Sequence, residues 1–525
     1  MSVTHRDAVI IGTGFGGSTV ALQLARAGKS VLLLERGRPV DRDESAWDTR
    51  AIHIDRKYQG ATPYHADTEK GTKLVRADEV VGGGSIFYGA ASFRLREDDF
   101  RMVSRFGPGP ADSAFVDWPF SYEDLAPWYT EAEQLLGVTG LAGADPTEPP
   151  RSGPYPAAPA PYAIPSARIV AAGESLGLRP FPIPLAINFS GRNGPGSQCI
   201  RCRTCDLFPC RIEAKNDLAV TVLPEAKRHG AEVRHGAVVT RLLREGERIR
   251  GVEYRDQATN TVSVVEADVV VVSAGAIASP RLLLASGLGD LEPNGALIGR
   301  HLMRHCNGAI IGFFASPMNP AEEFHKQVAF TDFYYGNGSG AAEPWGMIQS
   351  LQVPPPEFVR SLANFPVNII GYYTNPYNLF AMCIAEDNPQ YANRVTLHPT
   401  ACDAAGDPIA HVHYRHHRED FRRRQALYRV ARRILRRAGS WARGKHDVDT
   451  MSHALGTCRA GTDPSRAVLD PWCRMFGLAN LYVVDASFMP TSGAVNPSLT
   501  IAANGLRVGK HIAREWSTVL QRRAP

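Results

Sequence analysis

The sequence predicts an α/β fold in which a parallel sheet with flanking helices is interleaved with a mainly antiparallel-sheet domain. Three observations predict it. Strand and helix patterns alternate over the first 40 residues, and strongly apolar strand patterns return near 231–285 and close to the C-terminus. The stretch from about 300 to 445 is aromatic, mixed in pattern and poor in parallel-strand signals.

The first element is a strand, glycine turn, helix and second strand over residues 8–37, AVIIGTGFGGSTVALQLARAGKSVLLLERG. In its G-x-G-x-x-G pattern Gly12 allows the tight turn, Gly14 lets the backbone approach a pyrophosphate, and Gly17 lets the helix pack on the strand. Glu35 ends the second strand, where a carboxylate accepts hydrogen bonds from ribose hydroxyls and repels a 2′-phosphate. The pattern predicts a Rossmann-like dinucleotide site without separating NAD from FAD. The turn residues placed at this site are Gly12, Gly14, Phe15, Gly16 and Gly17.

The sheet that begins here is expected to be discontinuous in the sequence. Asp268 to Val272 has the pattern of a buried strand, and the small residues Ala274 and Gly275 that follow let a ligand lie against the backbone. We therefore expect three parts. The cofactor-binding domain comprises residues 1–40, 231–300 and 450–525, a covering and cysteine-rich connecting region spans 41–230, and a substrate domain spans 301–449.

Bulk composition excludes several classes of protein. With 525 residues, 44% hydrophobic and 21% charged, the chain is an ordinary globular protein with room for two or three cores. A net charge of +5 gives little support to a nucleic-acid partner, and no apolar window of about twenty residues predicts a transmembrane segment. No signal-peptide pattern precedes the first strand, so we expect a cytoplasmic protein.

One helix is expected to be strongly basic. Arginines crowd between residues 422 and 437, while Leu427, Ala431 and Ile434 supply a buried stripe at helical spacing. We expect the arginines to form mainly the solvated face of this helix. Docking to an acidic partner or to an anionic lipid surface is the alternative.

The C-terminal part resembles the closing signature of the glucose–methanol–choline (GMC) oxidoreductases. The residues that carry this likeness are HALGTCRAGTDP at 453–464, AVLDPWCRMFGLANLYVVDAS at 467–487 and PTSGAVNPSLTIAANGLR at 490–507. The glycine turn, VVGGGSIFYGA at 80–90 and SAGAIASPRLLLASG at 273–287 occupy the order and spacing of that family. The interval from about 305 to 445 matches least well. The resemblance implies FAD rather than NAD, bound without a covalent link, because GGGSIFYG contains no histidine.

The family places two polar residues at the flavin, which map here to His453 and Asn496 as catalytic residues. Oxidation of an alcohol removes the hydroxyl proton while a hydride leaves carbon, so a neutral imidazole suits the base and an amide can donate to the alkoxide. The other residues that the resemblance places at the cofactor are Gly83, Gly84, Ser85, Val238, Ala274, Gly275, Asp485 and Pro497. The chain departs from the family pattern at Ala460 and at Phe87 to Gly89, which leaves the shape of the pocket open.

Four of the nine cysteines stand close together, as Cys199, Cys202, Cys205 and Cys210. Three interpretations stay open. The thiolates could hold an iron–sulfur cluster or metal, although the last gap and the position of Pro209 fit such a motif poorly. They could form one or two disulfides, which a reducing compartment disfavours, or they could be reduced side chains in a tight loop.

Aromatic and polar residues alternate in HKQVAFTDFYYG at 325–336 and EDNPQYANRV at 386–395, as suits a polyhydroxylated ligand. Gln327, Asp332 and Gln349 are the polar candidates for contact with it. The function we expect is FAD-dependent oxidation of an alcohol, on a sugar, glycoside or polyol, with oxygen, a quinone or a protein as electron acceptor. The alternatives are a sterol, long-chain or simple alcohol oxidase and, from another class, a flavin-binding electron-transfer or redox-sensing protein without alcohol turnover.

Overall fold

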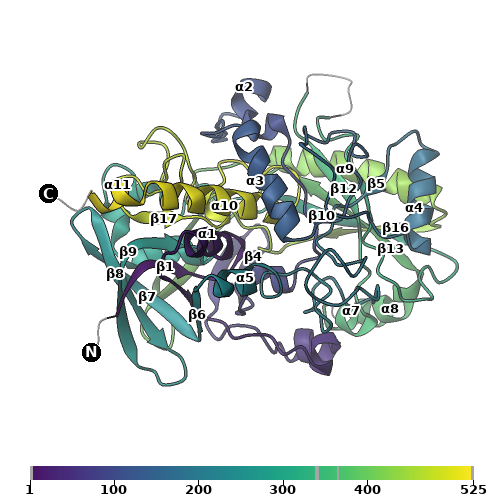
Figure 1. Ribbon diagram of the computed structural model, residues 1–525. Coiled ribbons are helices and arrows are strands. Elements are labelled where there is room, and N and C mark those ends of the chain that lie inside the picture. The colour runs from purple at the N-terminus through teal and green to yellow at the C-terminus, as the bar shows by residue number, and fades with distance from the viewer. Residues whose placement is uncertain (1–3, 337–341, 363–365, 522–525) are drawn as a thin grey trace.

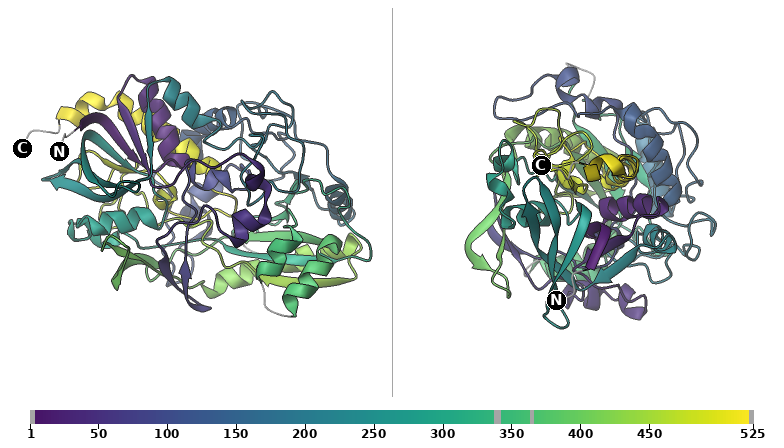
Figure 2. Two further views of the ribbon diagram at one scale, coloured as in Figure 1. Left: turned by 90° about the horizontal axis from the view of Figure 1, so that it is seen from below. Right: turned by 60° about the vertical axis from the view of Figure 1, so that its left-hand side comes forward.

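Three sheets organise the chain in the computed structural model, which describes residues 4–336, 342–362 and 366–521. Parts of the expected cofactor domain (1–3, 522–525) and of the expected substrate domain (337–341, 363–365) lie outside the described residues. Figure 1 shows the seven-stranded sheet at one end of the molecule and the six-stranded sheet at the other. Strand β1 and helix α11 lie together at the first of these ends, as the view from below also shows (Figure 2).

The seven-stranded sheet carries the glycine turn. Its order is β6-β2-β1-β9-β8-β7, with β17 paired to β9, and the pairs among β6, β2, β1, β9 and β17 are parallel. Strands β7, β8 and β9 form an antiparallel meander. The strands are β1 (Thr4–Ile11), β2 (Val31–Glu35), β6 (Glu232–His235), β7 (Ala237–Glu245), β8 (Arg248–Asp256), β9 (Val262–Val272) and β17 (Leu481–Val483). This confirms the predicted Rossmann-like sheet.

Helices α1 (Phe15–Arg26) and α10 (Ser498–Arg514) pack against each other beside this sheet. Their close approach depends on small residues in α10. A side chain at Gly505 would put its Cβ 2.1 Å from Thr19 Oγ1, and one at Gly509 would meet Val20 Cα at 3.0 Å. Helix α10 therefore holds α1, whose N-terminus begins at the glycine turn.

The six-stranded sheet is antiparallel, as predicted for the second domain. Its order is β16-β10-β13-β12-β11-β5, formed by β16 (Ala442–Asp447), β10 (Cys306–Phe313), β13 (Asn378–Ala385), β12 (Gly346–Leu351), β11 (Val328–Phe330) and β5 (Phe181–Pro182). Helices α4 (Ile164–Glu174) and α9 (Arg418–Arg437) pack on one face of it around Leu427 and Ile434. Strand β5 comes from the region expected to connect the domains.

Helix α9 is the expected basic helix, but its arginines do not all lie in water. Arg423 and Arg424 are buried. Arg424 donates to the backbone oxygen of Asn307 at 3.0 Å and lies 3.4 Å from a carboxylate oxygen of Asp447, whereas Arg423 faces Asp420. The expectation of a solvated face holds for the other arginines between 422 and 437, which are exposed.

A four-stranded sheet joins segments far apart in the sequence. Its order is β14-β15-β3-β4, formed by β14 (Arg394–Cys402), β15 (Pro408–His413), β3 (Tyr64–Thr68) and β4 (Gly71–Val75), with β15 and β3 parallel. Alternate residues point inward: Ala66, Val395 and Val412 belong to one apolar cluster, against which Ala454 packs. The sheet therefore supports the segment that carries His453.

Further α-helices lie outside these sheets. They are α2 (Met102–Phe106), α3 (Tyr122–Leu135), α5 (Val222–Arg228), α6 (Ala278–Ala285), α7 (Pro356–Leu362), α8 (Val367–Thr374) and α11 (Trp516–Gln521). Among the described residues, none of the helices combines the length and apolar character needed to cross a bilayer.

Candidate active site

The glycine turn is packed too tightly for larger residues at three positions. Gly12 has φ of 95°, and a Cβ there would lie 2.3 Å from the backbone oxygen of Ser273. A Cβ at Gly17 would lie 2.3 Å from the backbone oxygen of Gly12. The neighbouring Gly16 meets Val484 in the same way, at 2.2 Å. These contacts fasten the turn to the ends of β9 and β17.

Other glycines border open space instead. No heavy atom lies within 4 Å of the position that a Cβ would take at Gly14, Gly84 or Gly275. Gly83 stands over the turn, with its Cβ position 3.2 Å from Gly14 Cα. The turn and the segment at 83–84 thus form two sides of a cradle at the N-terminus of α1, which suits a pyrophosphate. These residues fit a bound dinucleotide.

Glu35 is buried and holds the turn in place from β2. One of its oxygens accepts hydrogen bonds from the Thr13 amide at 2.9 Å and hydroxyl at 2.7 Å, and the other accepts from Gly37 N at 2.8 Å. Thr13 in turn accepts from Gly82 N at 2.9 Å, which links this carboxylate to the 80–90 segment. Strand β6 pairs with β2 beside Glu35, and Val238 follows it, half-buried, at the start of β7.

The side chains of Asp485 and Ser85 form hydrogen bonds to other groups of the protein. Asp485 accepts hydrogen bonds from Gly275 N at 3.0 Å and from Ser487 N at 2.9 Å, joining the loop after β9 to the one after β17. The Ser279 hydroxyl donates to the same carboxylate and accepts from Ala274 N at 3.0 Å. The Ser85 hydroxyl donates to the Gly82 backbone oxygen at 2.7 Å and accepts from Leu218 N at 3.0 Å. Both side chains shape the walls around the cradle.

His453 lies against a second histidine, His305, that the sequence analysis did not single out. Their Nδ1 atoms are 3.0 Å apart and their rings are nearly perpendicular, at 88°. His305 Nε2 faces the backbone oxygens of Ser492, at 3.2 Å, and Gly493. Burial lowers the pKa of His453 to about 3 and that of His305 to about 4, so both rings are neutral at pH 7.

This network assigns the tautomer of each ring. Carbonyl oxygens only accept hydrogen bonds, so the proton of neutral His305 lies on Nε2 and its Nδ1 is an acceptor. His453 must then donate from Nδ1, which leaves the lone pair of His453 Nε2 available. His305 itself has φ of 60°, in the left-handed region that non-glycine residues rarely adopt.

Asn496 lies in the same loop as Ser492 and Gly493, whose backbone oxygens contact His305. Its Oδ1 is buried and has no hydrogen-bond partner among the described residues. Pro497 follows it and immediately precedes α10, where its ring restricts the backbone. A buried amide oxygen without a partner is costly in a folded protein, which indicates that a ligand completes this site.

The polar residues proposed on the substrate side have different surroundings. Both amide atoms of Gln327 are used by backbone groups, of Ala163 and Pro161, each at 2.9 Å. Asp332 accepts from Arg179 N at 3.1 Å through one oxygen, and its other oxygen is buried without a partner in the described chain. Gln349 on β12 likewise has a buried, unpartnered Oε1. Asp332 and Gln349 therefore both have an oxygen available for ligand contact, whereas Gln327 does not.

Three further ionisable residues come close to this site. Lys326 forms a buried ion pair with Asp206, with Nζ and Oδ2 3.0 Å apart, and its charge contributes to the lowered pKa of His453. A Cβ at Gly89 would lie 2.0 Å from Lys326 Nζ, which places this cation beside the 80–90 segment. Glu386 accepts from the Ser492 hydroxyl at 2.8 Å, and burial raises its pKa to about 8.

The four clustered cysteines are half-buried free thiols. Burial raises the pKa of Cys199 to about 11 and that of Cys205 well above its usual range. Within residues 199–210 no three ligand atoms lie within 4.8 Å of one another. Cys199 and Cys205 pack against the main apolar core, and the neighbouring Asp206 forms the ion pair with Lys326.

The comparisons with known proteins decide the family. A family model for the N-terminal part of the GMC oxidoreductases matches residues 6–307, and one for the C-terminal part matches residues 389–505. The chain belongs to the GMC oxidoreductases. This GMC protein is accordingly an oxidoreductase with FAD as its cofactor, and the predicted family and fold class are confirmed.

Two curated relatives of this GMC protein match it over nearly its whole length. It is 34% identical to 6'''-hydroxyparomomycin C oxidase of Streptomyces lividus and 32% identical to paromamine 6'-oxidase of Streptomyces fradiae. Each match covers 97% of this chain and 91% of the relative. Among solved structures, pyridoxine 4-oxidase from Mesorbium loti superposes with a TM-score of 0.66 at 21% identity, covering 97% of this chain and 99% of that one, which shows a shared fold.

Proposed function

We propose that this GMC protein oxidises a hydroxyl group of a sugar-like small molecule, most favourably one that carries amino groups, to a carbonyl. The observation that supports it most directly is the free lone pair of His453 Nε2, which the His305 network leaves ready to accept a proton. The two relatives above, whose names describe oxidases of paromomycin- and paromamine-type compounds, support the substrate class.

Unpartnered buried oxygens around the site favour a ligand with many donors. Such atoms include Gln349 Oε1 and Asn496 Oδ1 in the described chain. Each costs free energy until a donor reaches it, about 1–3 kcal/mol for a neutral group. A sterol or simple alcohol offers one hydroxyl, whereas an amino sugar offers several hydroxyl and ammonium donors. Glu386 is also a buried acid, and a nearby ammonium would stabilise its charged form.

The cradle residues are proposed to hold the cofactor. Gly14, Gly83 and Gly84 border the open space that suits the pyrophosphate, and Glu35 and Val238 lie at the edge of the sheet proposed for adenosine. Bound FAD supplies the hydride acceptor. We propose non-covalent attachment, because the 80–90 segment has no histidine. Acid precipitation of purified protein is expected to release all FAD to the supernatant, whereas yellow colour retained by the pellet would contradict this.

The chain's own residues handle the proton. His453 Nε2 accepts the hydroxyl proton, and the Asn496 amide donates to the oxygen as it gains negative charge. His305 positions His453 by accepting its Nδ1 proton. Burial of the pair excludes water that would otherwise solvate and weaken these contacts.

The substrate class is tested by anaerobic titration of the FAD-loaded protein with amino sugars, neutral sugars, sterols and simple alcohols, following flavin absorbance. We expect amino sugars to bleach the flavin fastest. Bleaching by sterols or simple alcohols alone would overturn the sugar-like class. A flavin that none of these compounds bleaches would favour a non-catalytic flavoprotein.

The role of His453 is tested with a His453→Ala variant in the same assay. Loss of the base is expected to slow flavin reduction by about 10²–10⁴-fold while the oxidised flavin spectrum is retained. His229→Ala is the matched control, because His229 is partly exposed and pairs with Glu225. Flavin reduction at the parent rate in the His453→Ala variant would contradict the proposed role of His453.

A further inference from the structure

The outer face of the four-stranded sheet carries a cluster of histidines. Because strand residues alternate, the apolar side chains of β3 and β15 point inward and polar ones point outward. Cross-strand pairing sets His411 opposite His65 and His413 opposite Asp67. Strand β14 adds His398, whose ring lies 4.3 Å from that of His65 and 5.0 Å from that of His411, measured between centroids.

Three of these side chains converge on one point. Asp67 Oδ2 lies 2.8 Å from His411 Nε2 and 3.6 Å from His413 Nδ1, and the ligand atoms of all three lie within 4.8 Å of one another. In a tetrahedral zinc site, ligand atoms about 2.0–2.2 Å from the ion are about 3.3 Å apart. The two distances from Asp67 lie on either side of this value, so small side-chain adjustments suffice.

Neighbouring hydroxyl groups orient the ligands. The Thr72 hydroxyl donates to Asp67 Oδ1, which leaves Oδ2 directed at the two histidines. His413 Nε2 lies 3.4 Å from Thr396 Oγ1, which fixes that ring with Nδ1 toward Asp67. Such outer contacts orient the ligands in known metal sites.

His398 is excluded as a ligand by its own hydrogen bonds. Its Nδ1 accepts from the backbone amides of Thr400 at 3.2 Å and Ala401 at 2.8 Å. The remaining nitrogen of the neutral ring must carry the proton and has no lone pair for an ion. His398 therefore serves as a matched control on the same face.

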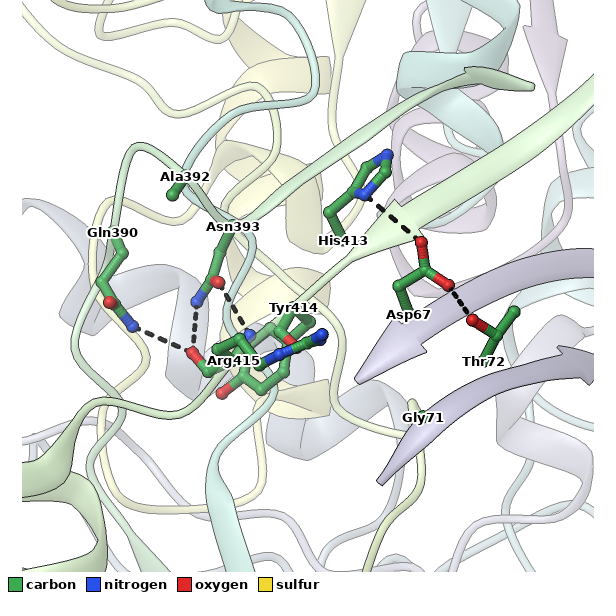
Figure 3. A pocket seen from close by; sticks show the side chains of 9 residues that line it. All are labelled: Asp67, Gly71, Thr72, Gln390, Ala392, Asn393, His413, Tyr414 and Arg415. Carbon is green, nitrogen blue, oxygen red and sulfur yellow. Dashed lines mark hydrogen bonds and ion pairs between the residues drawn. The ribbon is translucent and has the colours of Figure 1, made fainter. Parts of the chain in front are cut away.

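The cluster is open to solvent on one side. Asp67, Thr72 and His413 line one side of a hollow of about 530 Å³, with Arg415 and Asn393 on the other. Figure 3 shows Asp67 and His413 directed toward one another from adjacent strands at the rim of this hollow. Each of the three candidate ligands is half-buried, which leaves room for a water molecule as a fourth ligand.

We propose that Asp67, His411 and His413 bind one divalent transition-metal ion, with Zn²⁺ as the ion that two imidazoles and a carboxylate best suit. The ion would join β3 to β15, two strands that are neighbours in space and far apart in sequence. Because the inner face of this sheet packs against Ala454, the ion stiffens the support beneath His453.

The test uses full-length, FAD-loaded protein without a histidine tag, stripped of metal with a chelator. Calorimetric titration with Zn²⁺ is expected to show one ion per chain and a rise in thermal unfolding temperature. Titration with Co²⁺ is expected to give the ligand-field absorption of a four-coordinate site at wavelengths beyond the flavin bands. His411→Ala and His413→Ala are expected to weaken Zn²⁺ binding at least about tenfold, and His398→Ala to leave it unchanged.

All three variants lie outside the cofactor and substrate site, so flavin content and turnover in the absence of metal report that each is folded. Absence of saturable Zn²⁺ binding would overturn the proposal. Equal affinity in His411→Ala and the parent, or an equal loss in His398→Ala, would overturn it as well.

Discussion

Contacts within the protein determine which nitrogen of His453 carries the proton. His305 receives that proton at Nδ1 because its own proton is committed to the carbonyls of Ser492 and Gly493. Removing the acceptor would let His453 occupy either tautomer, and only one of them leaves Nε2 free. We therefore propose that His305 positions His453.

A pair of substitutions separates this positioning role from packing. His305→Leu is expected to slow flavin reduction by about tenfold or more, because His453 loses its acceptor. His305→Gln keeps a side-chain oxygen that can accept, so it should recover part of the rate. Stopped-flow reduction rates check this, and equal rates in the two variants would contradict the proposed role.

The pH profile gives a second readout of the same pair. Since burial lowers the pKa of His453 to about 3, the base stays neutral on the whole range above about pH 5. We expect kcat/KM to fall only as pH drops toward that pKa, with no inflection near 6.5, where a free histidine titrates. In His305→Leu the inflection should move to higher pH, since His305 contributes to lowering the pKa of His453. An inflection near pH 6.5 in the parent protein would contradict the buried base.

Sequence patterns predict residues that stand in a local signature and miss those defined by distant partners. His453 and Asn496 lie in recognisable C-terminal segments, and the structure gives both the partners or free atoms that the proposed roles need. His305 has no local signature, because its role comes from contacts with residues 453, 492 and 493. Gln327 is a polar residue that the local pattern proposed for ligand contact, yet both of its amide atoms form hydrogen bonds to the backbone.

At the scale of the element, substitutions at two positions of the glycine turn are expected to have different effects, one on FAD binding and the other on stability. Gly14→Ala places a methyl group in open space within the cradle, so FAD content should fall about tenfold while the apoprotein unfolds within about 0.5 kcal/mol of the parent. Gly17→Ala drives a methyl group into Gly12 O and should destabilise the fold by about 1–3 kcal/mol. The ratio of flavin to protein absorbance measures the FAD content of each variant, and urea denaturation measures its free energy of unfolding. A loss of stability in Gly14→Ala equal to that in Gly17→Ala would contradict the open cradle.

Elements with their own periodicity are predicted well, and elements that depend on distant pairing are not. The first strand, helix and second strand follow from apolar spacing and the glycine turn. The four-stranded sheet pairs β3 with β15 in parallel, and no local pattern connects these two short strands. Helix α9 was expected from its apolar stripe, yet burial of Arg424 depends on Asn307 and Asp447 in other strands.

For the whole molecule, buried histidines set how stability depends on pH. Burial lowers the pKa of His301 to about 3, of His305 to about 4 and of His416 to about 2, against about 6.5 in an unfolded chain. Below pH 6.5 the unfolded chain therefore binds protons that the folded protein does not. Each histidine then reduces the free energy of unfolding by up to about 1.4 kcal/mol per pH unit.

Buried acids act in the opposite direction. Burial raises the pKa of Glu386 to about 8 and of Asp99 to about 6. It also raises the pKa of Asp78, Asp217, Asp387 and Asp420. Their folded forms take up protons first, so they add stability as pH falls toward 4.5. The buried histidines with a lowered pKa outnumber these acids, since His53, His325, His446, His453 and His511 add to the three above. We therefore expect the free energy of unfolding to fall between pH 6 and pH 5. Urea denaturation checks this, and His416→Gln should flatten the slope. A slope unchanged in that variant would refute the contribution of His416.

The order of strands in the seven-stranded sheet has a consequence for synthesis. Strand β1 is made first, its partner β9 ends at Val272, and β17, which covers the other edge of β9, begins only at Leu481. At roughly 5–20 residues per second on the ribosome, β17 is synthesised on the order of ten seconds or more after β9, so that part of the edge of β9 stays unpaired for this time. Helix α10, which holds α1, emerges later still. A nascent chain released before this point carries the glycine turn but lacks the strand and helix that fasten it, and it exposes an apolar sheet edge to aggregation.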